Sequence, residues 1–479
     1  MQDGDKIFLT LGIVLGITAI FIVAIMLPPT KADSPIIIIN NRANSTSTCQ
    51  YNIMQLVNGS NPRTIQEFGC PNGNLLFQST NASAVFNDVM TRINSAGGGV
   101  VHVTGYNSTH PYNVTSAIII PNNGHLYFYG DGSEYTILQI PSGSDNNLFQ
   151  FSGTKTKNSF FNSWRDFEGM GNQGSGGVNN RGFVFNGTSF GITDSIIYNV
   201  FLRNFKQDDI YFNGVNCWNN KIDSDTIELA GRAGLYLTGT TSCLDVRVLN
   251  TKFLYNSQYG IYSDVTESTY VENWFYKNQQ VGAKLNGESR SIWEGNRFMD
   301  NSNGTNNGFY DMWILGSANS IVGNHFYGSE NGVNFVKYGV FFDTFENTNT
   351  FTGNTFGTGN FGTAKLFTSS TSQSMNLIAN NAGYNPVNKV TNPFWTTGNT
   401  IIPNSGNSAL PNNNTDTTNT NIPAFITVSG GTGVSITLKD NAGNTIQSGL
   451  ATITEQFVPY GYKINIKWST SPNVTVWLQ

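Results

Sequence analysis

Short apolar runs alternate with polar turns along most of this chain, and one apolar position recurs at a regular interval. In the middle of the chain a phenylalanine returns every 22 to 30 residues, and an asparagine stands two places before most of them. The phenylalanines are Phe253, Phe275, Phe298, Phe326 and Phe356, and the asparagines that precede the last four are Asn273, Asn296, Asn324 and Asn354. A repeat of this length predicts one coil of a parallel β-helix, in which each coil buries its inward side chains only when stacked on its neighbours.

The repeat extends backward with looser identities, to Asp225 before Ile227 and to Asn199 before Phe201. An asparagine at one fixed position of each coil predicts a ladder of amides, bonded from rung to rung at about 4.8 Å. Proline is absent between Pro141 and Pro386, although the chain has 15 prolines. Interior strands need almost every backbone N–H for the sheet, so residues 142–385 are predicted to form one continuous sheet system.

A helix is predicted directly before the first strands, because apolar residues between Ala82 and Ile93 fall on one helical face and a run of three glycines ends it. The order of helix, glycine turn and strands resembles the pectate-lyase-like right-handed β-helix superfamily over residues 82–385. The segments that carry the resemblance are Gly97-Gly98-Gly99-Val100-Val101-His102-Val103, Tyr112-Asn113-Val114, Ile118-Ile119-Ile120-Pro121, Tyr129-Gly130-Asp131-Gly132 and Thr136-Ile137-Leu138. The resemblance implies that the helix caps the open end of the β-helix, and it favours a carbohydrate-related role.

The predicted fold class is all-β: a right-handed parallel β-helix with an N-terminal capping helix and a small C-terminal antiparallel β-domain. The predicted divisions are a signal anchor or signal peptide at 1–35, a polar lead-in segment at 36–81, the β-helix at 82–385, a linker at 386–423 and a small β-sandwich-like domain at 424–479. The linker is rich in Asn, Thr, Ser and Pro and lacks alternation, whereas alternation returns after residue 424.

The N-terminus carries an apolar run, Ile7 to Leu27, that is long enough to span a membrane as a helix. Two interpretations stay open: a retained transmembrane anchor, and a signal peptide cut near Ala32. Either one predicts an exported protein, extracellular or at the cell surface. The four cysteines agree with an oxidising location. Cys217 and Cys243 are one coil length apart, which predicts a disulfide between adjacent rungs, and Cys49 and Cys70 form a second candidate pair.

The low content of charged residues and the net negative charge argue against nucleic acid as a partner. Charged residues make up 11% of the chain and the net charge is −5, which provides no basic stripe for nucleic acid. Glycosylation sequons permit a glycoprotein without requiring one; they occur at Asn44, Asn58, Asn81, Asn107, Asn113, Asn186, Asn303, Asn413 and Asn473. A homo-oligomer is compatible with the sequence.

The phenylalanine repeat also aligns other strands, and one alignment places aromatic side chains in a column. Strand alternation sends Ile210, Leu235 and Ile261 inward and Tyr211, Tyr236 and Tyr262 outward, with Lys284 on the next coil. Stacked outward tyrosines predict a flat aromatic strip that contacts polysaccharide or surface glycan. The alternatives are that a loop covers the strip, or that exposed tyrosines simply suit strands.

Two acidic groups are candidate catalytic residues. Asp245, Glu267 and Arg290 occupy equivalent positions on successive coils, so two carboxylates would stand about 5 Å apart, as in retaining glycoside hydrolysis. A surface salt-bridge ladder is the alternative. The second group is Asp208, Asp209 and Arg232. The paired aspartates resemble those of the polygalacturonase branch, but the His and Arg-x-Lys elements of that branch are missing, so its catalytic set is not carried over.

Three hypotheses follow. The first is an exported, membrane-tethered β-helix protein that binds or processes polysaccharide on its aromatic face. The second is a polysaccharide lyase or glycoside hydrolase that uses the acidic residues. The third is a structural adhesin, spike or envelope protein without catalysis. A cofactor is not identifiable from the sequence: carboxylate clusters of this kind are compatible with Ca²⁺, but no short loop has its ligand spacing.

Overall fold

The computed structural model describes most of residues 50–382, with gaps at 57–63, 70–72, 107–108, 153–157, 174–179, 188–190, 215–216, 240–242, 331–335, 344–347, 358, 369–376 and 380. It also describes segments between residues 400 and 478, mainly strands. Residues 1–49 lie outside the description, and with them the predicted span Ile7 to Leu27. Within the described part, no helix has the length and the apolar character needed to cross a membrane.

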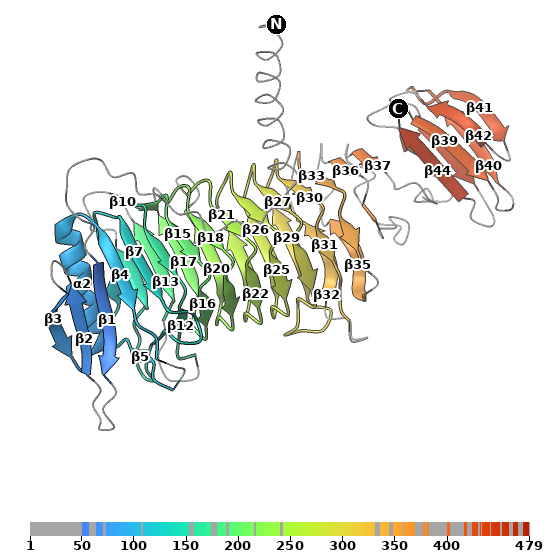
Figure 1. Ribbon diagram of the computed structural model, residues 1–479. Coiled ribbons are helices and arrows are strands. Elements are labelled where there is room, and N and C mark those ends of the chain that lie inside the picture. Colours follow the sequence, from blue (N-terminus) through green and yellow to red (C-terminus); the bar gives the residue numbers. More distant parts are fainter. Residues whose placement is uncertain are drawn as a thin grey trace, which may run out of the picture. The chain divides into compact units, whose positions relative to one another are not determined.

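The central part is a stack of parallel coils, and each coil contributes one short strand to each of three sheets (Figure 1). Sheet A has the order β3 (Asn74–Ser79), β2 (Thr64–Gly69), β1 (Gln50–Leu56), β4 (Gly99–Val103), β7 (Leu126–Gly130), β11 (Ser163–Arg165), β15 (Ile196–Tyr198), β18 (Lys221–Asp223), β21 (Arg247–Leu249), β24 (Thr269–Val271), β27 (Ile292–Glu294), β30 (Ser320–Val322), β33 (Thr350–Thr352), β36 (Leu377–Ala379), β37 (Thr400–Ile402).

Sheet B contains β5 (Tyr112–Asn113), β8 (Ile137–Gln139), β12 (Glu168–Met170), β16 (Phe201–Arg203), β19 (Thr226–Glu228), β22 (Lys252–Leu254), β25 (Trp274–Tyr276), β28 (Arg297–Met299), β31 (His325–Phe326), β34 (Thr355–Phe356). Sheet C contains β6 (Ile118–Ile119), β9 (Phe149–Ser152), β13 (Phe183–Gly187), β17 (Ile210–Gly214), β20 (Ala233–Thr238), β23 (Tyr259–Ser263), β26 (Val281–Asn286), β29 (Phe309–Leu315), β32 (Val336–Phe342), β35 (Phe361–Thr368). A further parallel pair joins β10 (Ser159–Phe160) to β14 (Ile192–Thr193).

The recurring phenylalanines form the inner column of sheet B, as predicted. Phe253, Phe275, Phe298, Phe326 and Phe356 are paired in register and buried. Their rings stack with centroids 4.5 to 5.2 Å apart. One extension of the repeat is wrong: Leu202, not Phe201, pairs with Ile227 and points inward. Phe201 is partly exposed, because this coil places two apolar residues side by side and only one can face the core.

The predicted amide ladder is present at the turn between sheets A and B. The side-chain N–H₂ of each asparagine donates to the side-chain oxygen of the next at 2.9 to 3.0 Å, through Asn273, Asn296, Asn324, Asn354 and Asn381. All five are buried. The ladder also accepts backbone N–H groups at the turns, so buried polar groups are satisfied where the chain changes direction.

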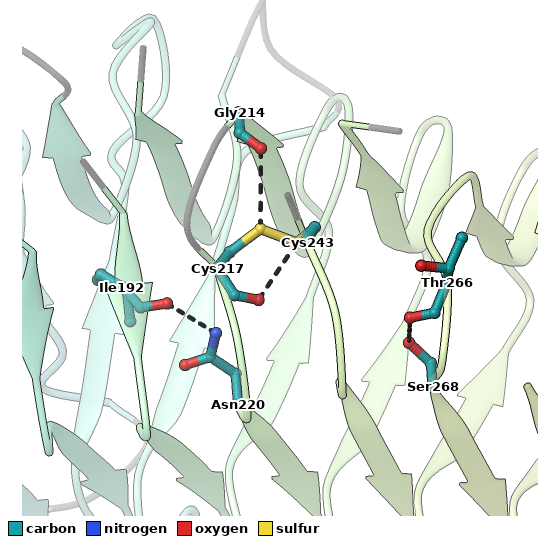
Figure 2. The surroundings of a disulfide bond; sticks show 7 residues. All are labelled: Ile192, Gly214, Cys217, Asn220, Cys243, Thr266 and Ser268. Atoms are coloured by element: carbon teal, nitrogen blue, oxygen red, sulfur yellow. Dashed lines mark hydrogen bonds between the residues drawn. A yellow bond between two sulfur atoms is a disulfide. The ribbon is translucent and has the colours of Figure 1, made fainter. Parts of the chain in front are cut away.

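The predicted disulfide between neighbouring coils is present. Cys217 and Cys243 are bonded, with their Cα atoms 4.6 Å apart. Figure 2 shows the bridge beside Asn220, whose side chain donates to the carbonyl oxygen of Ile192 at 2.7 Å. The second candidate pair, Cys49 and Cys70, lies outside the described residues.

The helix α2 (Ala82–Ala96) forms where the sequence predicts it. Asn81 caps its N-terminus by accepting the backbone N–H of Ser83, and Gly97 ends it with a φ of 80°, a conformation that favours glycine. Its buried face includes Phe86, whose ring lies 5.8 Å from that of Tyr112 in the first coil.

The region predicted as a polar lead-in instead contains strands. β1 pairs in parallel with β4, and β2 and β3 continue sheet A by antiparallel pairing. At the other end β37 pairs in parallel with β36, so sheet A also enters the predicted linker. In the lead-in region β2 alternates partly exposed and buried side chains, and β3 has partly or fully exposed side chains, so neither strand gives a continuous apolar run in the sequence.

The C-terminal region forms antiparallel sheets. One contains β38 (Asp416–Thr418), β43 (Lys463–Lys467), β40 (Ser435–Lys439) and β41 (Thr445–Leu450), and the other contains β42 (Ile453–Val458), β39 (Ala424–Ser429) and β44 (Asn473–Leu478). Ile436 and Ile464 are buried between polar neighbours, which is the alternation expected of strands with one covered face.

Candidate functional site: the outer face of sheet C

The outer face of sheet C carries a continuous column of aromatic and basic side chains. Tyr211 of β17 pairs with Tyr236 of β20, which pairs with Tyr262 of β23. Lys284 of β26 and Trp313 of β29 continue the column in register. All five side chains are partly exposed, whereas the predicted inward neighbours of the tyrosines, Ile210, Leu235 and Ile261, are fully buried. We call these five residues the aromatic strip.

The tyrosine rings of the strip stack on one another. The centroids of Tyr236 and Tyr262 are 4.3 Å apart and their planes differ by 2°, and Tyr211 lies 5.8 Å from Tyr236 at 37°. Stacking at the rung spacing of a parallel sheet exposes the ring edges and hydroxyl groups as a row. Burial raises the pKa of Tyr211 and of Tyr262 above the usual value for tyrosine, so these hydroxyls stay protonated and can donate hydrogen bonds.

Two arginines hold one end of the strip. Arg232 donates to Asp208 at 2.8 and 2.5 Å, and Arg181 donates to the same carboxylate at 2.9 Å. The Arg232 guanidinium lies 3.7 Å from the ring centroid of Tyr236, and that of Arg181 lies 4.4 Å from Tyr211. Asp208 is buried, and it therefore works as an anchor that fixes both guanidinium groups against the tyrosine rings.

Lys284 is the one cation among the five strip residues, between Tyr262 and Trp313. Its ammonium nitrogen lies 3.9 Å from the ring centroid of Trp313 and 5.6 Å from that of Tyr262. Burial lowers the pKa of Lys284, and the Asp343 carboxylate partly opposes that shift. Asp343 also accepts a hydrogen bond from the Trp313 indole at 3.0 Å, which fixes the indole beside the lysine. The result is a positioned, partly desolvated cation on an aromatic surface.

Sequence reasoning missed four residues of this site: Arg181, Asp264, Trp313 and Asp343. Trp313 continues the strip. The turn that precedes β29 is longer than the corresponding turns before β23 and β26, so Trp313 does not stand at the regular sequence distance from Lys284. Asp264 directly follows the end of β23, beside Tyr262, and burial raises the pKa of its carboxyl group. Asp264 also adds to the raised pKa of Tyr262. Counting two residues on from each strip residue would have found it, since alternation returns every second side chain to the same face.

The structure places Asp209 inside the coil, away from the strip. Its side chain is fully buried. Burial, with a contribution from the charge of Asp208, raises the pKa of Asp209 well above its ordinary value. The register aligns Asp209 with Gly234 on the next coil, a position where a Cβ would contact Phe253. Asp209 is thus an interior residue rather than a carboxylate on the outer face.

The predicted column Asp245, Glu267 and Arg290 lies at the turn between sheets C and A. The preceding residues Leu244, Thr266 and Ser289 form successive parallel bridges, so the predicted alignment of the three positions is present. Glu267 forms an ion pair with Arg290 at 2.8 Å, and both side chains are largely exposed. An exposed pair of this kind is typical of a surface salt bridge. Three His, Cys, Asp or Glu side chains do not converge on a metal-sized site anywhere in the described ranges.

Comparison with known proteins places the fold. No protein-family model matches the chain, and no curated protein matches it. Among solved structures, the enzymatically active domain of tailspike protein 2 from bacteriophage CBA120 has a TM-score of 0.50 at 11% identity, over 80% of this chain and 66% of that chain. DFA-IIIase from Arthrobacter chlorophenolicus A6 has a TM-score of 0.49 at 12% identity, over 69% and 96% of the two chains.

The A-module of mannuronan C-5 epimerase AlgE4 from Azotobacter vinelandii has a TM-score of 0.48 at 14% identity, over 63% of this chain and 90% of that chain. Identities this low concern the fold alone. The in-register coils, the interior phenylalanine column and the tailspike similarity show that this chain is a parallel β-helix, the fold that the resemblance seen in the sequence implies.

Proposed function

We propose that this protein is an exported surface protein that binds a polysaccharide along the outer face of sheet C. The observation that carries the proposal is the aromatic strip itself, five partly exposed side chains in one in-register column. Sugar rings bind proteins by laying their C–H faces on aromatic rings while their hydroxyl groups bond at the edges. A column with a ring or cation at every rung offers such contacts to an extended chain over several rungs.

The fixed orientation of the strip supports binding. Arg232 is held by Asp208, and Trp313 is held by Asp343, so the side chains lose little conformational entropy when a ligand binds. The cations Arg232 and Lys284 add donors for hydroxyl or acidic groups of the polymer. Export is supported by the disulfide between Cys217 and Cys243, which is typical of oxidising compartments. The proposal retains an N-terminal anchor at Ile7 to Leu27, or cleavage near Ala32.

Retention of the protein on a panel of immobilised polysaccharides tests this function. We expect wild type to be retained by at least one polymer, and Tyr236→Ala with Tyr262→Ala to weaken that binding by about tenfold or more, since each lost ring contact is worth on the order of 1 kcal/mol. Tyr135→Ala is the matched control, because Tyr135 is 55% exposed and lies outside sheet C. The proposal fails if every polymer ignores wild type, or if the Tyr135 variant loses as much binding as the double variant.

A second candidate function is a lyase-type reaction on the bound polymer. Lys284 and Asp264 flank Tyr262, and burial shifts their pKa values in opposite directions, down for the lysine and up for the aspartate. Such shifts bring a base and an acid closer to neutral pH. Release of unsaturated product by wild type, lost in Lys284→Gln while retention on the polymer persists, would establish catalysis. Retention without product in wild type would leave binding alone.

A further inference from the structure

Sheet B presents a second, separate column on its outer face. Lys252 of β22, Trp274 of β25, Arg297 of β28 and His325 of β31 are paired in register. The residues that follow them in the strands, Phe253, Phe275, Phe298 and Phe326, form the interior column, so these four side chains point away from the core. Lys252 and Arg297 are exposed, and Trp274 is 36% exposed between them.

More aromatic surface adjoins this column. Tyr276 lies two residues after Trp274, with ring centroids 5.5 Å apart, and Tyr255 contacts Tyr276 at 5.5 Å from the preceding coil. Tyr255 is 38% exposed. We call Lys252, Trp274, Arg297, Tyr255 and Tyr276 the sheet B patch. Contiguous exposed aromatic surface with Trp, Tyr and Arg side chains is typical of an interaction site.

The two outer cations of the patch lack acidic partners. Within the described part of the chain, no carboxylate forms an ion pair with Lys252 or Arg297, whereas Arg165, Arg181, Arg203, Arg232 and Arg290 all do so with a neighbour. Unpaired cations on either side of an exposed indole create a positive surface with an aromatic centre. Its complement is an anionic ligand that also has a flat face to stack.

The distance between the two cations of the patch indicates which class of anionic ligand fits. Lys252 and Arg297 stand two rungs apart, about 9.6 Å along the stack at the strand spacing of a sheet. Trp274 lies on the rung between them. A ligand with two anionic groups about 9.6 Å apart and one sugar ring between them would contact both cations and Trp274 at once. An extended acidic polysaccharide in which charged and uncharged sugars alternate has this arrangement.

We propose that the sheet B patch binds an acidic polysaccharide of alternating charged and uncharged sugars, with a sugar ring on Trp274 and carboxylate groups on Lys252 and Arg297. This surface is distinct from the aromatic strip, because the two lie on different sheets of the same coils. It gives the β-helix two faces for polymer, one of them selective for negative charge.

Affinity for hyaluronan, measured by biolayer interferometry on the full chain, tests the proposal, with dextran as the uncharged comparison. We expect wild type to bind hyaluronan and not dextran, with an affinity that falls as salt is added. Lys252→Gln with Arg297→Gln, and separately Trp274→Ala, should each weaken binding by about tenfold, as expected when about 1.4 kcal/mol is lost. Arg247→Gln is the matched control, an exposed arginine on sheet A.

Three results would overturn the proposal. Wild type that ignores hyaluronan at low salt would do so, and so would an Arg247→Gln variant that loses as much affinity as the double variant. The third is concentration-dependent dimerisation that Trp274→Ala abolishes in a protein without glycan binding, which would make this face an interface between copies. Tyr236→Ala should leave hyaluronan binding within about twofold, so failure at the aromatic strip and failure here are separable.

Discussion

At the scale of single residues, the amide ladder is the most specific device of this fold. Asn296 is fully buried; it donates to Asn324 and to the carbonyl oxygen of Tyr270, both at 2.9 Å, and accepts from Asn273. Asn296→Ala would leave Asn273 and Tyr270 with unpaired buried groups, so we expect the free energy of unfolding to fall by about 3 kcal/mol. Urea denaturation followed by circular dichroism measures the loss.

The matched control for the ladder is Asn213→Ala. Asn213 is partly exposed on sheet C, and within the described residues its side chain makes one long hydrogen bond, a donation to Asn186 at 3.5 Å, so the expected loss is about 0.5 kcal/mol or less. Equal losses in the two variants would show that the ladder adds nothing beyond an ordinary surface amide.

The sequence alone predicts residues that repeat and misses those that do not. The phenylalanines of the column and the asparagines of the ladder each recur once per coil, so stacking gives them a period that can be seen in the sequence. Phe201 is wrongly predicted to face inward because the other coils have phenylalanine in that column, and only the packed coil shows that Leu202 takes the place. Trp313 was missed because its turn has an unusual length. The burial of Asp209 could not be predicted, because two adjacent aspartates are normally expected at the surface.

At the scale of elements, the disulfide joins two neighbouring coils. Cys217 and Cys243 are 26 residues apart, and closing a loop of that size restricts the unfolded chain, by about 3 kcal/mol in the chain-entropy model. We expect Cys217→Ser with Cys243→Ser to lower the free energy of unfolding by about that amount in urea titrations.

A reductant provides the control for the disulfide prediction. It acts alike in both proteins on Cys49 and Cys70, so the difference between wild type and the double variant should vanish under reducing conditions. A difference that persists in reductant would mean that the serine side chains, and not the missing bond, cause the loss.

At the scale of the whole molecule, buried carboxyl groups set the pH dependence of stability. Burial raises the pKa of Glu288 from 4.5 to about 7, although Trp293 donates to it at 3.1 Å. Burial likewise raises the pKa of Asp311 to about 7 and that of Glu67 to about 8. A raised pKa in the folded state means that folding favours the protonated form. The stabilisation is therefore complete below the unfolded pKa values, 4.5 for the two glutamates and 3.8 for Asp311, and is lost as the pH rises through 7 to 8.

We expect the protein to be more stable at pH 5 than at pH 8, as measured by urea midpoints at both values. Glu288 alone accounts for roughly 2 to 3 kcal/mol of the difference, because folding raises its pKa from 4.5 to about 7. Glu288→Gln keeps an uncharged side chain of the same shape, so its stability should change less between the two pH values by about that amount. A variant with the same pH dependence as wild type would refute the assignment.

The central claim is that the aromatic strip binds polymer, and a structure of the protein with an oligosaccharide from a polymer that retains it tests this most directly. We predict sugar rings in van der Waals contact with Tyr236 and Tyr262, and hydroxyl or acidic groups within hydrogen-bond distance of Lys284 or Arg232. An oligosaccharide bound elsewhere, for example beside Glu267 and Arg290, with both tyrosines uncontacted, would contradict the account.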